Sequence, residues 1–239
     1  MSILSTADLE FNVGLEFSFS NLSFDNIEFT SKGYLMELSH QLPTNLTISD
    51  SSFTNIQAGS ILIVSSNLQN TLLTSNVHIL NSKMNYIGEK STSFINLKEG
   101  GRLFINSCNF TNLHTLRNGA AISAGFQKTK TVIYDSIFQN NTAKDGGVFS
   151  ITGESVIKCY NCTLNNNFAI TSGVVNVGQS GQSEFYGSRI FNNYANNNPV
   201  SLIFNTALDS IYDQTEVYNN RGLKRSEIIT EFGSSCSKL

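Results

Sequence analysis

The feature that most constrains the fold is an internal repeat that runs through most of the 239-residue chain. Each unit has a β-rich run, a small residue, one spacer, a large apolar residue that we call the anchor, and usually Asn two positions later. The anchors recur every 26 to 31 residues, and self-similarity at a near-constant period is the signature of a repeat architecture. The anchors are Phe24, Phe53, Met84, Phe110, Phe138, Leu164, Ile190 and Val217.

Other positions keep register with the anchors. Two residues before them stand mostly small residues: Leu22, Ser51, Ser82, Cys108, Ser136, Cys162, Ser188 and Thr215. Five residues before them stand residues suited to burial: Phe19, Ile48, Ile79, Ile105, Ile133, Cys159, Phe185 and Tyr212. Two residues after them, seven of eight are Asn: Asn26, Asn55, Tyr86, Asn112, Asn140, Asn166, Asn192 and Asn219. Nine residues after them, Gly recurs at Gly33, Gly119, Gly147 and Gly173.

Each unit also has a second strand-like run, rich in β-branched and aromatic residues. These runs are Tyr34–Leu38, Ser60–Val64, Phe94–Leu97, Ala120–Ala124, Val148–Ile151, Val174–Val177 and Val200–Phe204. No stretch has the pattern of a capped amphipathic helix. Short strands at this period match one coil of a parallel β-helix, whereas the ladder of a leucine-rich repeat is absent and a propeller blade needs about 40 residues.

The sequence therefore predicts an all-β fold, a single-stranded parallel β-helix (β-solenoid) of about eight coils of roughly 27 residues. Residues 1–239 are expected to form a single β-helix domain, either by itself or as a segment of a longer repeat array. In such a fold, equivalent residues of neighbouring coils stack at about 4.8 Å. Inward-facing Asn side chains then hydrogen-bond along the axis, and Asn tolerates the left-handed conformation needed at bends.

Two phrases carry a resemblance to a known family. Phe138-Gln-Asn-Asn-Thr-Ala143 with Gly146-Gly-Val-Phe149, and Leu164-Asn-Asn-Asn-Phe-Ala169 with Gly173-Val-Val175, resemble the polymorphic-membrane-protein repeat. That family alternates a Phe-x-x-Asn phrase with a Gly-Gly-apolar-apolar phrase, and its members resemble pectin-lyase-like right-handed parallel β-helices that are typically adhesive surface or secreted proteins. The resemblance, together with the right-handed crossover rule, implies right-handed winding.

Composition excludes several classes of function. Charged residues make up only 14% of the chain, and 15 basic against 18 acidic side chains give a net charge of −3. This charge balance does not suit a phosphate-binding surface, so we expect no nucleic-acid partner. The longest aliphatic run, Ile61–Val64, is far shorter than the roughly 18 residues of a membrane span, so we expect no membrane span in this chain.

The search for catalytic residues finds none. A carbohydrate-active β-helix enzyme needs carboxylates gathered over neighbouring coils. Asp50 and Asp135 share a column, but they lie three coils apart and fit turns better. Two pairs on adjacent coils, Lys158 with Glu184 and Arg189 with Glu216, are expected to be surface ion pairs. For an enzyme, the loops Ser65–Ser75 and Ser180–Gly187 are the candidate locations, and neither offers paired acids.

No metal or cofactor site is expected either. The histidines His40, His78 and His114 fall at unrelated phases of the repeat and do not converge. The cysteines of the inward columns, Cys159 and Cys162 among them, are expected to be small buried hydrophobes. A local Cys159–Cys162 disulfide across the bend is an alternative that the sequence leaves open.

The leading interpretation is a non-catalytic structural or adhesive interaction solenoid that binds protein or glycan through its outer faces. The alternative is a carbohydrate-active β-helix enzyme, similar to a polysaccharide lyase or a glycoside hydrolase. The run Glu227–Phe232 begins a further coil, which predicts an open edge and end-to-end self-association. Localisation is extracellular or at the cell surface if the chain is part of a longer protein, and peroxisomal if Ser237-Lys238-Leu239 is the native C-terminus.

Overall fold

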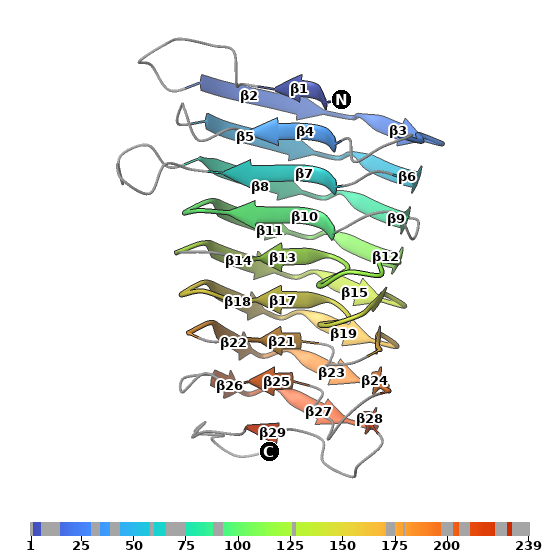
Figure 1. Ribbon diagram of the computed structural model, residues 1–239, viewed down its shortest axis with the longest axis vertical. Helices are drawn as coiled ribbons and strands as arrows, with labels where there is room; N and C mark the ends of the chain where they lie inside the picture. Colours follow the sequence, from blue (N-terminus) through green and yellow to red (C-terminus); the bar gives the residue numbers. More distant parts are fainter. Residues whose placement is uncertain are drawn as a thin grey trace.

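The protein is a stack of parallel strands, and Figure 1 shows the stacking direction vertically with the strands running across it. The computed structural model describes residues 2–5, 15–29, 34–38, 44–57, 60–65, 75–87, 93–125, 128–170, 175–178, 180–196, 203–205, 211–222 and 229–230. Within these ranges the secondary structure is all β, and no helix could cross a membrane. The prediction of an all-β parallel solenoid is confirmed. The handedness of the winding and the number of complete coils stay predictions.

Strands that recur once per coil form four parallel sheets. The first sheet contains β1 (Ser2–Ser5), β4 (Tyr34–Leu38), β7 (Ser60–Ser65), β10 (Ser93–Lys98), β13 (Ile122–Ala124), β17 (Phe149–Ile151), β21 (Val175–Val177), β25 (Ile203–Asn205) and β29 (Ile229–Thr230). The second contains β2 (Leu15–Ser20), β5 (Thr44–Ser49), β8 (Asn76–Leu80), β11 (Arg102–Asn106), β14 (Lys130–Tyr134), β18 (Val156–Tyr160), β22 (Gln182–Tyr186) and β26 (Ile211–Asp213). The third contains β3 (Ser23–Asp25), β6 (Ser52–Ile56), β9 (Lys83–Ile87), β12 (Asn109–Leu113), β15 (Ile137–Gln139), β19 (Thr163–Asn165), β23 (Arg189–Phe191) and β27 (Glu216–Tyr218). The short fourth sheet contains β16 (Thr142–Ala143), β20 (Phe168–Ala169), β24 (Tyr194–Ala195) and β28 (Arg221–Gly222).

The register confirms the columns that the repeat predicts. All eight anchors, from Phe24 to Val217, are direct partners of one another in the third sheet. The column five residues earlier, from Phe19 to Tyr212, stacks in the same way in the second sheet. The seven second strand-like runs overlap strands of the first sheet, although Val174 and residues 200–202 lie outside the described residues. The anchors make the core continuous, because aromatic rings pack through it, as Phe110 does on Phe138 with ring centroids 4.8 Å apart.

The Asn residues divide into two columns with different roles. The Asn residues that stand two positions after the anchors have positive φ, for example 54° at Asn166, which confirms their place at left-handed bends. However, their side chains are exposed, so the expectation that this column faces inward is wrong. The buried ladder lies one residue later, at Asn141, Asn167 and Asn193. A residue in the left-handed conformation reverses the alternation of a strand, and this turns the following side chain toward the core.

A second polar ladder follows the column two residues before the anchors. The backbone N–H of Ser51 donates to Oγ of Ser82 at 3.1 Å, and the N–H of Cys162 donates to Oγ of Ser188 at the same distance. The Ser136 hydroxyl donates in turn to the carbonyl oxygen of Tyr134, two residues earlier, at 2.6 Å. The small residues of the repeat therefore satisfy backbone groups at the corner between the second and third sheets.

The predicted glycine column needs one correction. A bridge between Asn118 and Asp145 sets Gly119 against Gly146, not against Gly147. Both Gly119 and Gly146 have positive φ, 64° and 61°. The later unit is one residue shorter between its anchor and this bend, so the equivalent glycine arrives one position earlier. The remaining predicted positions, Gly33 and Gly173, lie outside the described residues.

Candidate functional site

Among the described residues, the histidines and the Asp50 and Asp135 carboxylates do not converge. In the described part of the chain no three His, Cys, Asp or Glu side chains are grouped to hold a metal ion. His78 lies in β8 and His114 follows β12, whereas His40 lies outside the described residues. Asp50 and Asp135 both have positive φ, and each accepts a hydrogen bond at 3.3 Å from the Asn one coil later. The interpretation of these two carboxylates as turn residues is confirmed.

The three cysteine thiols that the structure describes are buried and free. Cys108, Cys159 and Cys162 form no disulfide, so the Cys159–Cys162 bridge that the sequence left open is not formed. Burial raises the pKa of Cys108 to about 11, and it raises the pKa of Cys159 as well. Cys162 belongs to the second polar ladder, two residues before the anchors, because its Sγ donates to the carbonyl oxygen of Tyr160 at 3.5 Å as the Ser hydroxyls of that ladder do. Burial therefore disfavours the thiolate form, the nucleophilic one, at Cys108 and Cys159.

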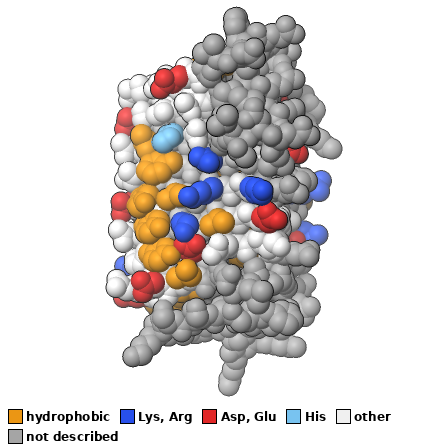
Figure 2. All heavy atoms as spheres, turned by 90° about the vertical axis from the view of Figure 1, so that its left-hand side faces the viewer, with side chains coloured by type: hydrophobic (Ala, Val, Ile, Leu, Met, Phe, Trp, Pro, Cys, Tyr) orange, Lys and Arg blue, Asp and Glu red, His pale blue; other side chains and the backbone are white. Residues whose placement is uncertain are grey.

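A continuous row of rings runs along the outer face of the second sheet, and we call it the aromatic ladder. Its members are His78, Phe104, Tyr134, Tyr160 and Tyr186, from β8, β11, β14, β18 and β22. Ring centroids are 4.8 Å apart between Tyr134 and Tyr160 and 4.9 Å apart between Tyr160 and Tyr186, with the planes within 12° of parallel. Figure 2 shows a vertical band of hydrophobic side chains on this side of the molecule, with Lys and Arg side chains beside it.

Basic residues flank the ladder on the same face. Arg102 and Lys130 are direct partners in β11 and β14, and both are exposed. Lys158 lies one coil further, between Val132 and Glu184 in the register of the sheet. The alternation of the strands turns all of these side chains outward, since the intervening residues are buried. We call the aromatic ladder together with Arg102, Lys130 and Lys158 the aromatic–basic face.

The aromatic–basic face contains one buried carboxylate. Glu184 has a side chain only 5% exposed, and its Oε2 lies 2.6 Å from Nζ of Lys158. The Tyr186 hydroxyl donates to the same oxygen at 2.8 Å. The predicted Lys158–Glu184 pair is thus confirmed, but it is less exposed than expected. Most of the candidate loop Ser180–Gly187 is strand β22 (Gln182–Tyr186). Glu184 therefore lies in a regular strand of the repeat and not in a loop.

This cluster is unsuited to general-base catalysis. The hydrogen bond to Glu184, followed by burial, raises the pKa of Tyr186 to about 12. The phenol is therefore protonated at neutral pH and acts as a donor. The carboxylate of Glu184 is paired with Lys158, and its direct partners in the sheet register are Lys158 and Ile211, while Asp213 lies beside Tyr186. The geometry provides a fixed polar contact point, in which one carboxylate oxygen is held by an ammonium group and a phenol.

A second exposed cluster lies on the third sheet near its C-terminal end. The Arg189 guanidinium carbon is 5.5 Å from the ring centroid of Phe191, and Nη2 donates to the Tyr218 hydroxyl at 3.1 Å. Nε of Arg189 lies 3.3 Å from Oε2 of Glu216, which confirms the other predicted ion pair. The phenol and carboxylate partners raise the pKa of Arg189 further. These groups satisfy one another and leave little free for a ligand.

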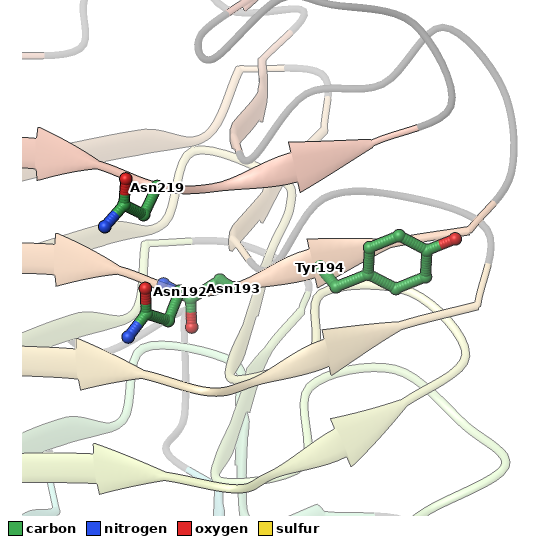
Figure 3. Close-up of a pocket in the computed structure, with 4 residues that line it drawn as sticks. All are labelled: Asn192, Asn193, Tyr194 and Asn219. Carbon is green, nitrogen blue, oxygen red and sulfur yellow. The ribbon is translucent and has the colours of Figure 1, made fainter.

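Near this cluster lies a recess of about 380 Å³ lined by Asn192, Asn193, Tyr194 and Asn219. In Figure 3 the side chains of Asn192 and Asn219 project from successive coils in the same direction, whereas the Tyr194 ring extends away from them. Asn193 is buried, and its amide belongs to the Asn ladder. The recess offers amides and one phenol, so it provides hydrogen bonds and no acid–base group.

No protein-family model matches the chain, and no curated protein matches it. The site therefore rests on geometry. Sequence reasoning identified Lys158, Glu184, Arg189 and Glu216 but missed the aromatic ladder. A signal was available, because Tyr134, Tyr160 and Tyr186 each stand four residues before an anchor.

Proposed function

We propose that the chain is a non-catalytic interaction solenoid that binds an acidic protein surface through its aromatic–basic face. The aromatic ladder carries this proposal. Four ring-to-ring contacts join its five members into one outward-facing row, in which His78 is exposed and the other four rings are half-buried. Aromatic residues and Arg are enriched in the centres of protein interfaces, where they contribute most of the binding energy.

The stacking of the rings favours a protein partner over a glycan. Both faces of the Tyr160 ring are covered, by Tyr134 on one side and by Tyr186 on the other. Sugar rings bind aromatic residues through the ring faces, but this ladder presents edges and hydroxyls. Such groups suit a flat protein surface with hydrogen-bond acceptors. Arg102 and Lys130 supply the charge for an acidic partner.

The finer points of the sequence resemblance belong to the same proposal. We infer a right-handed, pectin-lyase-like winding because crossovers between parallel strands are right-handed in about 98% of cases. An adhesive role at a cell surface is consistent with an extended outer face, and it rests on the Phe138–Phe149 and Leu164–Val175 phrases. The peroxisomal alternative rests on Ser237-Lys238-Leu239, which lies outside the described residues.

The test uses two anionic polymers as probes, poly-L-glutamate for an acidic polypeptide and polygalacturonate for an acidic glycan. Binding of poly-L-glutamate is expected to weaken at least tenfold in the double variant Arg102→Glu/Lys130→Glu. The control is Lys83→Glu/Arg117→Glu, which makes the same charge change at exposed residues outside the second sheet and should leave binding within twofold.

Two outcomes contradict the proposal. Binding of polygalacturonate alone would replace the protein partner with a glycan. Breakdown of that polymer, abolished by Glu184→Gln, would replace binding with catalysis. The variant Tyr160→Ser tests the contribution of the aromatic ladder to binding separately from charge, since it interrupts the stacked rings and removes no charge.

A further inference from the structure

One carboxylate of the aromatic–basic face is more buried than the lysine that it pairs with. Glu184 lies at an outward position of β22, yet its side chain is only 5% exposed, whereas that of Lys158 is 30% exposed. An ion pair in this fold needs no such burial, because Glu216 is 65% exposed in its pair with Arg189. The neighbours of Glu184 therefore enclose it to a degree that charge pairing alone does not require.

Lys158 and Tyr186 together hold this carboxylate. Nζ of Lys158 lies 2.6 Å from Oε2 of Glu184, and the Tyr186 hydroxyl donates to the same oxygen at 2.8 Å. Lys158 is the direct partner of Glu184 in the sheet register, and Tyr186 stands two residues further along the same strand. An ammonium group and a phenol that converge on one oxygen are suited to bind a carboxylate, since charge-assisted hydrogen bonds are the stronger ones.

The repeat does not require an acid at the position of Glu184. Each coil has one equivalent residue, six positions before its anchor: Ser18, Thr47, His78, Phe104, Val132, Lys158, Glu184 and Ile211. Glu184 is the single acid of this series, and it directly follows the single lysine. The other coils stack in the second sheet with neutral residues at this position, so the acid is not needed to hold coils together.

The three basic residues of the face differ in what they offer to a partner. Arg102 and Lys130 are exposed, and within the described ranges neither of them forms an ion pair. The ammonium group of Lys158 already has a carboxylate, so an acidic partner has to displace Glu184 in order to bind it. Figure 2 shows acidic side chains next to basic ones beside the hydrophobic band.

We propose that Lys158 and Tyr186 form a carboxylate-binding subsite of the aromatic–basic face, and that Glu184 occupies this subsite as a built-in competitor of an acidic polypeptide. This inference rests on the proposed function, because the competing carboxylate is one from the same partner. A partner that docks on the face contacts Arg102 and Lys130 directly, but it contacts Lys158 only where its own carboxylate replaces Glu184. Glu184 therefore keeps the affinity of the face below the value that its basic residues allow.

The experiment measures the affinity for poly-L-glutamate by isothermal titration calorimetry. Glu184→Gln removes the competing charge but keeps the shape of the side chain and an acceptor for the Tyr186 hydroxyl. Binding is expected to become about fivefold tighter. Two controls remove a carboxylate without releasing Lys158: Glu216→Gln, in the exposed pair of the third sheet, and Asp213→Asn, at the exposed residue beside Tyr186. Both should leave the affinity within about twofold, because exposed charges are screened by salt.

A double-mutant cycle separates competition from a general change of charge. Lys158→Gln is introduced into the unmodified chain and into Glu184→Gln. The loss of affinity should be several times larger in the second background, since the ammonium group is available to the partner only there. If the two charges acted on the polymer independently, Lys158→Gln would cause the same loss in both backgrounds, and that result would overturn the proposal.

The outcomes distinguish failure of the subsite from failure of the proposed function. If neither the unmodified chain nor Glu184→Gln binds poly-L-glutamate, the proposed function fails and the subsite with it. If the unmodified chain binds but Glu184→Gln binds no more tightly, or the controls strengthen binding equally, the subsite alone is wrong.

Labelling with an amine-reactive ester, located by mass spectrometry, tests the subsite without any partner. The labelling rate of Lys158 should rise severalfold in Glu184→Gln, while that of Lys130 stays the same. An unaltered rate at Lys158 would show that Glu184 does not withhold its ammonium group. Circular dichroism checks that each variant is folded.

Discussion

The amide of Asn167 donates from Nδ2 to Oδ1 of Asn193, one coil further along the solenoid, at 3.0 Å. The same nitrogen donates to the carbonyl oxygen of Phe138, and the backbone N–H of Asn167 donates to Asn193 Oδ1 at 2.8 Å. Each buried amide thus holds the coil before it and the coil after it. The ladder joins consecutive bends through side chains where the sheets are interrupted.

Asn167→Ala is expected to lower the free energy of unfolding by about 3 kcal/mol, because it leaves the buried carbonyl of Phe138 and the N–H of Asn141 without partners. The matched control is the neighbouring exposed residue, Asn166→Gly, which keeps the left-handed bend and should cost only a few tenths of a kcal/mol. Urea denaturation measures both values. Equal losses in the two variants would contradict the assignment of the inward column.

The two neighbouring cysteines should respond differently to the same substitution. Cys162→Ser is expected to change stability by less than about 0.5 kcal/mol, since Ser occupies equivalent positions of the ladder at Ser136 and Ser188. Cys159→Ser should cost about 1–3 kcal/mol, because Cys159 lies in an apolar column between Ile133 and Phe185. Thermal unfolding of the two variants measures both losses of stability. A larger loss in Cys162→Ser than in Cys159→Ser would refute the assignment of Cys159 to an apolar column and of Cys162 to a polar one.

Gly146→Ala is expected to destabilise the fold by at least about 2 kcal/mol. The φ of Gly146 is 61°, and an added Cβ would collide with the carbonyl oxygen of Phe149. Gly125→Ala is the control, because its Cβ would meet only Oγ1 of Thr152 at an ordinary 3.5 Å. Chemical denaturation compares the variants, and similar stability in both would show that the bend tolerates a side chain.

The Tyr186 phenol predicts a pH dependence on the alkaline side. Its pKa rises from 10.0 to about 12 in the folded protein, so the folded state holds the proton more tightly than the unfolded chain. This contribution to stability is complete below pH 10 and is lost as the pH rises toward 12. Tyr186→Phe should therefore lose less stability over that range than the unmodified protein.

Tyrosinate absorbance provides a direct check of the same phenol. The tyrosinate signal that develops near pH 12 should weaken in Tyr186→Phe, and it should shift to lower pH in Glu184→Gln, which removes the acceptor charge. A titration curve unaltered by Glu184→Gln would contradict the assigned cause of the shift.

Much of the architecture was predictable because stacking in a solenoid makes the same chemical demand once per coil. The anchors from Phe24 to Val217 and the ion pairs Lys158–Glu184 and Arg189–Glu216 all followed from the spacing alone. The glycine register was wrong by one residue at Gly147, since a bend absorbs a one-residue change in length that spacing cannot locate. The aromatic ladder was also missed, because outward positions tolerate varied residues and only adjacent coils reveal a shared surface.

The sequence by itself determined that the chain winds into stacked coils, and it determined which residues lie above one another, because identical side chains at a fixed period pack only in that arrangement. The tertiary structure decided which way the side chains beside each bend point. Asn166 is exposed and Asn167 is buried, although both are Asn and adjacent, because a single left-handed residue reverses the alternation of the strand. The direction of that reversal depends on backbone angles that the neighbouring coils fix.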